Sequence, residues 1–184
     1  AAYDDYLREL RDKDLSEPDI EALARNDAVG FLRQAAEGLP EKTVLLAKRL
    51  IKDVFSLANS TGQPLDESRL SPLPFRRAVL LLEEGRLNGE GFRQTLEALY
   101  TRGGEAEATA READLLIQKD DRAVEKAIAK TLAEVQPMVA EYRAGKAAVR
   151  NAIFGRVMKE LNKKGDPKMV GALLDAALGP PGQG

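Results

Sequence analysis

The residues of this sequence with the most evident chemistry are cations near its carboxyl end. Eight of the 28 Lys and Arg residues follow Pro137, whereas only four of the 30 Asp and Glu residues do so. The chain as a whole carries a formal net charge of −2, so this excess is local. A local excess of charge steers the binding of a partner and does not build a fold. We therefore expect a binding surface in this region.

The stretch from Lys146 to Asn162 is predicted to be a helix with two different faces. At about 100° per residue, an apolar side and a cationic side fall opposite one another. The apolar side carries Ile153, Val157 and Leu161, and the cationic side carries Arg156, Lys159 and Lys163. Taken alone, a basic stripe of this kind is more often an ordinary solvated face than a binding site.

Two more cations, Lys164 and Lys168, flank the tripeptide Gly165-Asp166-Pro167. Gly residues end helices and Pro residues begin them, so we interpret this tripeptide as the junction between two helices and not as a nucleotide motif. Gly155 lies within the basic helix, where glycine usually marks close packing between helices.

Catalysis within this chain is restricted by composition, because the sequence contains no His and no Cys. Triads, Cys-His pairs, zinc deaminase sites and thiolate metal sites all need one or both. Carboxylate or Lys mechanisms remain, for which Glu83 and Glu84 are candidates. Adjacent acids at a helix end are usually solvated, and no glycine-rich phosphate loop accompanies them. We predict neither a catalytic nor a metal site in this chain.

The elements that position the basic stretch are predicted to be helices throughout. Ala, Leu, Glu, Arg and Lys dominate, alternating strand patterns are absent, and helix breakers recur at intervals suited to helices of about 10 to 18 residues. Helices are expected from Glu17, from about Asn26, over 41–59, from Pro72 to Gly85, from Asn88 to Gly103, weakly over 105–116, from about Asp121 to Val135, over 146–162, and after Pro167.

Charge divides the chain into two parts. Residues 1–115 contain 16 basic and 22 acidic residues, a net charge of −6, and the remainder contains 12 and 8, a net charge of +4. We predict a helical domain over 1–115, a tail domain of three to four helices over 116–178, and a flexible terminus of Gly, Pro and Gln over 179–184. Only residues 103–118 link the two bodies, and Gly103-Gly104 is the expected bend.

The setting of the chain is predicted from what its sequence lacks. No apolar run approaches the roughly 18 to 20 residues of a membrane span, and no signal-peptide pattern opens the chain, so we expect a cytoplasmic protein. The first residue is Ala and not Met, and we interpret the chain as a piece of a longer protein.

Three segments near the carboxyl end resemble one known family. "YRAGK", "FGRVMK" and "KKGDPKMVGALL" are similar in order and spacing to the tail of GatB, a component of the bacterial tRNA-dependent Asp/Glu amidotransferase, and YqeY proteins share a related tail. Upstream, "LSPLPFRRAVLLLEEGRLNGEGFRQTLEALY" resembles the helical hairpin of that family. The family usually has Gln at Arg156, a small residue at Asn151 and an apolar one at Arg150. We expect Arg150 to extend past the core edge or to meet an acid of the first domain.

The resemblance implies a role in tRNA-dependent amidation. In that family, GatB acts with the A and C subunits to convert Glu-tRNA(Gln) or Asp-tRNA(Asn) to the amide, as part of an ATP-dependent, glutamine-hydrolysing carbon–nitrogen ligase. ATP and Mg²⁺ would bind an N-terminal domain that nothing here resembles, so this chain alone is expected to be inactive and to hold no cofactor. It would bind tRNA, and neither DNA nor a membrane, through Lys146, Arg156, Lys159, Lys163, Lys164 and Lys168.

Two alternatives remain open. The chain is also compatible with a helical adaptor that binds other proteins through the acidic residues between Asp4 and Glu21, or with a free-standing YqeY-like protein. Salt-sensitive binding of tRNA distinguishes the tRNA-binding role from an adaptor.

Overall fold

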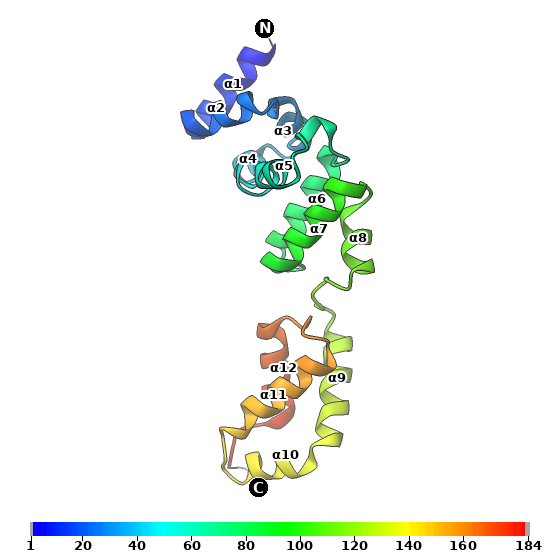
Figure 1. Ribbon diagram of the computed structural model, residues 1–184. Coiled ribbons are helices and arrows are strands. Elements are labelled where there is room, and N and C mark those ends of the chain that lie inside the picture. Colours follow the sequence, from blue (N-terminus) through cyan, green and yellow to red (C-terminus); the bar gives the residue numbers. More distant parts are fainter. Residues whose placement is uncertain (1, 183–184) are drawn as a thin grey trace. The chain divides into compact units, whose positions relative to one another are not determined.

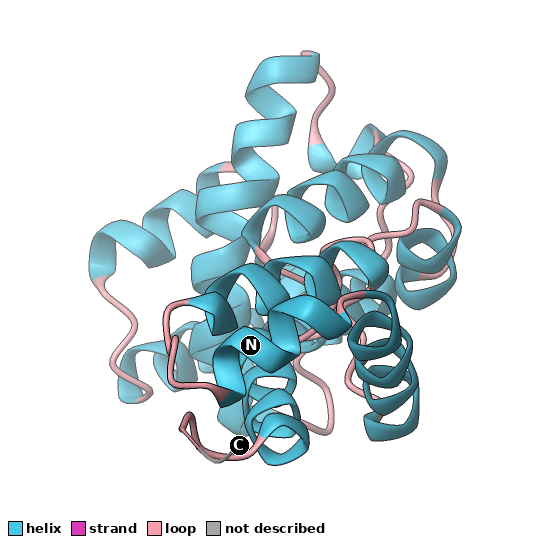
Figure 2. Ribbon diagram, turned by 90° about the horizontal axis from the view of Figure 1, so that it is seen from below, coloured by secondary structure: helices cyan, strands magenta, loops and turns pink. Residues whose placement is uncertain are grey.

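The protein is all-α, as predicted. The computed structural model describes residues 2–182, and within that range the chain forms helices joined by short loops without any strand (Figure 2). The chain divides into two compact units, Ala1–Leu115 and Leu116–Gly184. Each unit has a core of its own.

The first unit begins with three short helices, of which the second shows how sequence sets a helix start. They are α1 (Ala2–Asp12), α2 (Glu17–Arg25) and α3 (Val29–Ala35). Ser16 caps α2 by accepting a hydrogen bond from the Asp19 amide, and Pro18 lies in the first turn, where its missing N–H costs nothing. Helix α1 was not predicted, although Tyr3, Tyr6, Leu7 and Leu10 recur in it at helical spacing and Tyr6 and Leu10 are buried.

The helix predicted over 41–59 is continuous in the chain but irregular in geometry. A short 3₁₀ turn (Pro40–Lys42) leads into α4 (Thr43–Arg49), a π-helical segment (Leu50–Val54) and α5 (Phe55–Thr61). The broad apolar pattern predicted burial on more than one side. Leu46, Leu50, Val54 and Phe55 are all buried, and a π-helical turn shifts the register of the buried positions along the helix.

A helical hairpin completes the first unit. After a 3₁₀ turn (Leu65–Glu67), α6 (Pro72–Glu83) and α7 (Gly89–Arg102) pack together, and α8 (Ala106–Glu112) packs on both. Asn88 caps α7 by accepting a hydrogen bond from the Gly91 amide at 2.7 Å. Ser71 occupies the cap position of α6 without a side-chain hydrogen bond.

The expected bend at Gly103-Gly104 is wrong. Both glycines have positive φ, but they connect α7 to α8, and α8 belongs to the first unit. Ala106 and Ala110 are buried, and Glu107 forms ion pairs with Arg77 and Arg86. These contacts fix α8 to its own unit, so the two glycines shape a tight turn inside it.

The second unit is formed by α9 (Asp121–Glu134), α10 (Gln136–Arg143), α11 (Val149–Glu160) and α12 (Pro167–Leu178) (Figure 1). Helices α9, α11 and α12 contact one another in pairs, and α10 packs on α11. One cluster of buried side chains draws on all four helices, namely Val124, Ala127, Ile128, Val135, Val139, Tyr142, Ile153, Val157, Val170, Leu174 and Leu178.

The predicted helix over 146–162 is shorter than expected. Residues 147–148 form a turn, the Val149 amide bonds to the Lys146 carbonyl, and α11 starts at Val149. At the other end, α11 stops at Glu160 because Asn162 and Lys163 adopt positive φ values of 56° and 63°. The amide of Lys163 then bonds to the Met158 carbonyl at 2.7 Å, which closes the helix end.

Gly165, in the junction after α11, lies in close contact with neighbouring side chains and with the backbone of Gln118. Its stretch pairs in parallel with Gln118, whose amide bonds to the Lys164 carbonyl while its carbonyl accepts the Asp166 amide. A Cβ added at Gly165 would lie 2.7 Å from Leu161 Cδ1 and 2.8 Å from Val170 Cγ2. The glycine is therefore required by close approach.

The terminus predicted over 179–184 is described only in part. Helix α12 ends at Leu178, Gly179 has a φ of 74°, and no helix continues to Gly182. Residues 183 and 184 lie outside the described residues. Across 2–182, no helix has both the length and the apolar character needed to cross a membrane.

Candidate nucleic-acid interface

Helix α11 has the two faces that its sequence predicts. Ile153 and Val157 are both 0% exposed, whereas Arg156 and Lys159 on the opposite side are exposed. Among the ion pairs of residues 2–182, none involves Arg156 or Lys159. Two cations one turn apart thus face solvent from a helix whose other side is anchored in the core.

Helix α9 packs against α11 next to this cationic side. The Lys130 ammonium forms an ion pair with Glu160 at 2.6 Å, and further toward the start of α9, Gln118 pairs with Gly165. The hydrogen bond from Lys130 to Glu160 raises the pKa of the Lys130 ammonium above its ordinary value. A shallow hollow of about 240 Å³ between the two helices is lined by Thr131, Glu134, Arg156, Lys159 and Glu160.

Lys163 and Lys164 follow the helix and are not part of its cationic row. Lys163 is exposed, but it follows the end of α11 and has a positive φ, so helical period no longer supports its predicted alignment with Arg156 and Lys159. Lys164 is half-buried, and its carbonyl accepts the hydrogen bond from Gln118. The backbone of Lys164 therefore has a structural role at the junction.

Lys146 and Lys168 are exposed but lie elsewhere in the unit. Lys146 precedes the first residue of α11, so the twelve residues of that helix separate it from Lys163. Lys168 stands in the first turn of α12, on the side that carries Gly171 and Asp175 by helical period. The structure thus brings together Arg156 and Lys159, with Lys163 just beyond them, and leaves Lys146 and Lys168 apart.

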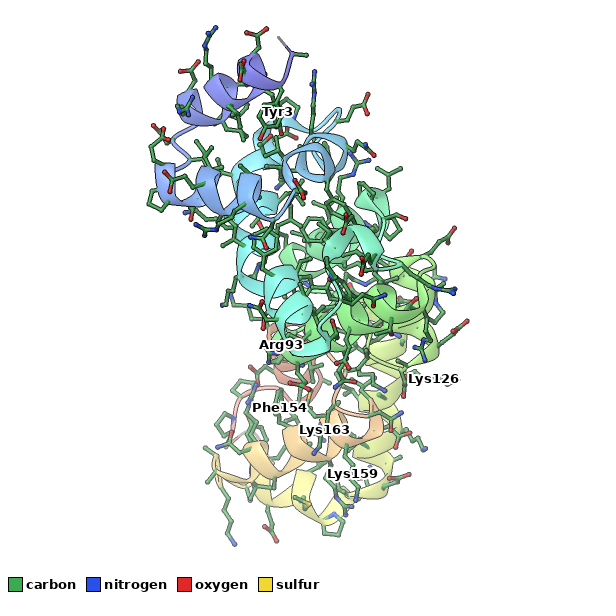
Figure 3. The ribbon with its side chains drawn as sticks, turned by 45° about the horizontal axis from the view of Figure 1, so that its top comes forward. Tyr3, Arg93, Lys126, Phe154, Lys159 and Lys163 are labelled. Carbon is green, nitrogen blue, oxygen red and sulfur yellow. The ribbon has the colours of Figure 1, made fainter. Side chains whose placement is uncertain are left out.

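Two cations of α9 were missed by the sequence analysis. Lys126 and Lys130 are exposed and lie one turn apart on α9, with Arg122 one turn earlier (Figure 3 labels Lys126 on α9 and Lys159 and Lys163 at the end of α11). The spacing i, i+4, i+8 was visible in the sequence. What was missing was the contact between α9 and α11, which joins Lys130 of this row to Glu160.

Arg150 has a partner other than the predicted acid of the first domain. Its Nε lies 2.6 Å from Oδ1 of Asp175 in α12, and its Nη2 donates to Oδ2 at 3.2 Å. Nη2 also donates to the Gly171 carbonyl, and the guanidinium lies over the Phe154 ring at 5.6 Å. The hydrogen bond with Asp175 raises the pKa of Arg150. Arg150 thus joins α11 to α12 and is already engaged.

Gly155 and Tyr142 also have roles that the structure resolves. Gly155 is exposed, and nothing lies within 4 Å of a Cβ built there, so the prediction of close helix packing is wrong. Tyr142 is 5% exposed and donates its hydroxyl hydrogen bond to the Gly179 carbonyl at 2.9 Å. Tyr142 is thus a core residue, and its ring is not open for a base to stack on it.

The catalytic alternative gains no support from the geometry. Glu83 and Glu84 are exposed at the end of α6, and Glu84 forms an ion pair with Arg77 at 3.6 Å. Within the described part of the chain, no three carboxylates come together as a group able to hold a metal ion. The two acids remain interpreted as solvated.

Comparison with known proteins gives a consistent set of relatives. The family profile described as the GatB domain matches residues 31–178. A protein named as the B subunit of aspartyl/glutamyl-tRNA(Asn/Gln) amidotransferase, from Anaeromyxobacter dehalogenans (strain 2CP-C), is 33% identical over 140 residues, covering 76% of this chain and 29% of that protein. Its namesake from Corynebacterium glutamicum (strain R) is 36% identical over 121 residues, covering 66% of this chain and 24% of its own length.

A longer match extends toward the start of the chain. The protein of the same name from Anaeromyxobacter sp. (strain Fw109-5) is 32% identical over 176 residues, which cover 94% of this chain and 36% of that protein. The chain therefore spans about a quarter to a third of the length of these relatives.

Proposed function

The chain belongs to the GatB domain family, and from this membership we propose that it is the tRNA-binding part of a GatB amidotransferase protein. In this role the second unit binds the body of Glu-tRNA(Gln) or Asp-tRNA(Asn), and the reaction that forms the amide takes place in another domain. The names of the relatives support the role in tRNA-dependent amidation, since each is named as the B subunit of an Asp/Glu-tRNA amidotransferase.

One observation carries the proposal for tRNA: Arg156 and Lys159 are exposed cations, with no ion pair in the described chain, on a helix fixed by Ile153 and Val157. Phosphate contacts supply most of the affinity of a sequence-independent nucleic-acid surface. A rigid helix places such contacts without needing to fold on binding. The charge of the second part of the chain, 12 basic against 8 acidic residues, supports the same partner.

The remaining parts of the machinery are proposed to lie outside this chain. The A and C subunits of the amidotransferase would assemble with full-length GatB, and ATP and Mg²⁺ would bind its N-terminal domain. By itself the chain is expected to bind tRNA without turning it over, and to bind neither DNA nor a membrane. Formation of Gln-tRNA(Gln) by this chain without other subunits would contradict the proposal that the reaction takes place outside it.

The test exchanges Arg156 and Lys159 together for Gln. Removing one phosphate interaction lowers the magnitude of the salt slope by roughly 0.7 to 0.9, which corresponds to about 25- to 60-fold weaker binding for two such interactions at 0.1 M salt and little change near 1 M. The melting temperature should hardly move, because both side chains point away from the core and Gln is nearly as good a helix former. Gel shifts or anisotropy with cognate and non-cognate tRNA, titrated with salt, measure the affinity and the slope, and a thermal melt checks the stability.

The control is the same exchange at Lys42 and Lys48 in the first unit, which removes the same charge. That pair should weaken tRNA binding much less. Equal losses from the two pairs would mean that only net charge matters. Unchanged tRNA binding by the Arg156 and Lys159 variant would return these cations to an ordinary solvated face and would favour the protein-binding adaptor.

A further inference from the structure

The cationic surface beside α11 has a second row, contributed by α9. Lys126 and Lys130 are one turn apart on α9, with a rise of about 6 Å between them, and Arg156 and Lys159 form the facing row on α11. The Lys130–Glu160 ion pair at 2.6 Å joins the two helices next to these rows, and Arg156 and Lys159 line a hollow with Thr131 and Glu134 of α9. Packed helices have axes about 8 to 10 Å apart, so cations on both helices cover a surface wider than one sugar-phosphate backbone.

This surface offers cations without aromatic rings. The second unit contains two aromatic residues, Tyr142 and Phe154. Tyr142 is buried with its hydroxyl on Gly179, and Phe154 is half-buried with the Arg150 guanidinium over its ring. Proteins that bind single strands use exposed aromatic rings on which bases stack. The α9–α11 surface lacks such a platform within residues 116–182.

The ridge of α11 that projects most toward solvent carries short side chains. Ala152 and Gly155 are exposed, precede Lys159 by helical period, and leave the cations beside them unobstructed. A stiff ligand can therefore lie along the helix while the long side chains reach its phosphates.

We propose that the α9–α11 pair binds the backbone of double-helical RNA and that Lys126 contacts a phosphate there. In this proposal Glu160 weakens the binding, because its ion pair engages Lys130. Helical RNA is recognised mostly by shape, through its phosphates and 2′-hydroxyls, which suits a broad and rigid cationic surface. This inference rests on the proposed tRNA-binding function and assigns the helical stems of tRNA as the part bound.

Two single substitutions test the second row in opposite directions. Lys126→Gln should lower the magnitude of the salt slope by about 0.9 and weaken binding roughly eightfold at 0.1 M salt. Glu160→Gln should strengthen binding, because it removes an anion from the surface and releases Lys130 for phosphate. If the Lys130–Glu160 ion pair has only a structural role, Glu160→Gln should instead cause a small loss of stability and no gain in affinity.

Each substitution has a matched control on α10 with the same change of charge. Arg143→Gln controls for Lys126→Gln, and Glu141→Gln controls for Glu160→Gln, since both α10 residues are exposed and outside the α9–α11 pair. Binding is measured by anisotropy with a whole tRNA, with an RNA hairpin whose stem has about 16 base pairs, and with an unstructured oligouridine of equal charge. The hairpin should bind more tightly than the oligouridine, and only the α9–α11 substitutions should change its affinity.

The outcomes separate this inference from the proposed function. If tRNA binding falls in the Arg156 and Lys159 variant but Lys126→Gln behaves like Arg143→Gln, the proposed function stands and the second row is wrong. If neither variant changes tRNA binding, both proposals fail. Oligouridine binding as tight as hairpin binding overturns the assignment to double-helical RNA, whatever the substitutions do.

Discussion

Replacing Gly165 by Ala is expected to destabilise the second unit strongly. The added Cβ would lie 2.7 Å from Leu161 Cδ1, 2.8 Å from Val170 Cγ2 and 3.3 Å from Met158 Sδ. Leu161 and Met158 are half-buried and able to shift their flexible ends. Val170 is 0% exposed and β-branched, so its methyl group has no alternative position without movement of α12.

The cost follows from that geometry. Overpacking of this kind typically costs about 1 to 3 kcal/mol, which for a unit of this size lowers the melting temperature by about 5 to 20 °C. Displacing Gly165 would also strain its pairing with Gln118, which holds the residues just before α9. Amide hydrogen exchange resolves the effect by unit, since α9, α11 and α12 should lose protection while α6 and α7 keep theirs.

Gly155→Ala is the matched control, because it makes the same chemical change in the same unit. Gly155 is exposed within α11 and has nothing within 4 Å of an added Cβ, so Ala should stabilise the helix by about 0.5 to 1 kcal/mol. The two glycines should thus give effects of opposite sign. A Gly165→Ala protein as stable as the unchanged chain would refute the close-approach explanation.

Two further substitutions test buried and paired side chains. The Tyr6 hydroxyl is buried without a hydrogen-bond partner in the described chain, and burial, aided by Glu9, raises the pKa of Tyr6 to about 12. Since the pKa of Tyr6 in the folded protein exceeds the ordinary value of 10, the neutral phenol favours the folded state fully below pH 10, and this stabilisation is lost as the pH rises toward 12. In urea titrations from about pH 8 to 11.5, Tyr6→Phe should therefore lose less stability at high pH than the unchanged chain. An unchanged pH profile would contradict this expectation. For Arg150 and Asp175, a double-mutant cycle with Arg150→Gln and Asp175→Asn should give a coupling free energy of unfolding of up to about 1 kcal/mol. Zero coupling would mean that the ion pair does not stabilise the contact between α11 and α12.

Local signals made much of the fold predictable from the sequence. Ser16 and Asn88 accept the hydrogen bonds expected of cap residues, Pro72 occupies the first turn of α6, and Gly103 ends α7 with positive φ. These features act within one turn of the chain and do not depend on distant packing. Helix α10 was missed because its eight residues are too few for apolar periodicity to show, whereas α1 was overlooked although Tyr3, Tyr6, Leu7 and Leu10 recur at helical spacing.

The candidate site was predictable only as far as one helix extends. Arg156 and Lys159 face away from Ile153 and Val157 because of helical period alone. Helical period could not predict the direction of Lys163, because α11 ends at Glu160 and both Asn162 and Lys163 itself have positive φ although neither is a glycine. The proposed role of Lys126 and the partnership of Arg150 with Asp175 depend on contacts between helices, which no local pattern contains.

The ion pairs of the second unit give a physical reason why some of its cations remain available. Lys119 pairs with Asp166, Lys130 with Glu160, and Arg150 with Asp175, and each pair joins two different elements of the unit. Three basic residues and three acidic residues of the unit thus form the ion pairs that hold its elements together. Among the residues described there, Lys126, Arg156 and Lys159 remain exposed and outside these pairs. Substituting them changes the electrostatic potential without disturbing the pairs that hold the helices together, and this separation is what allows binding and stability to be tested independently.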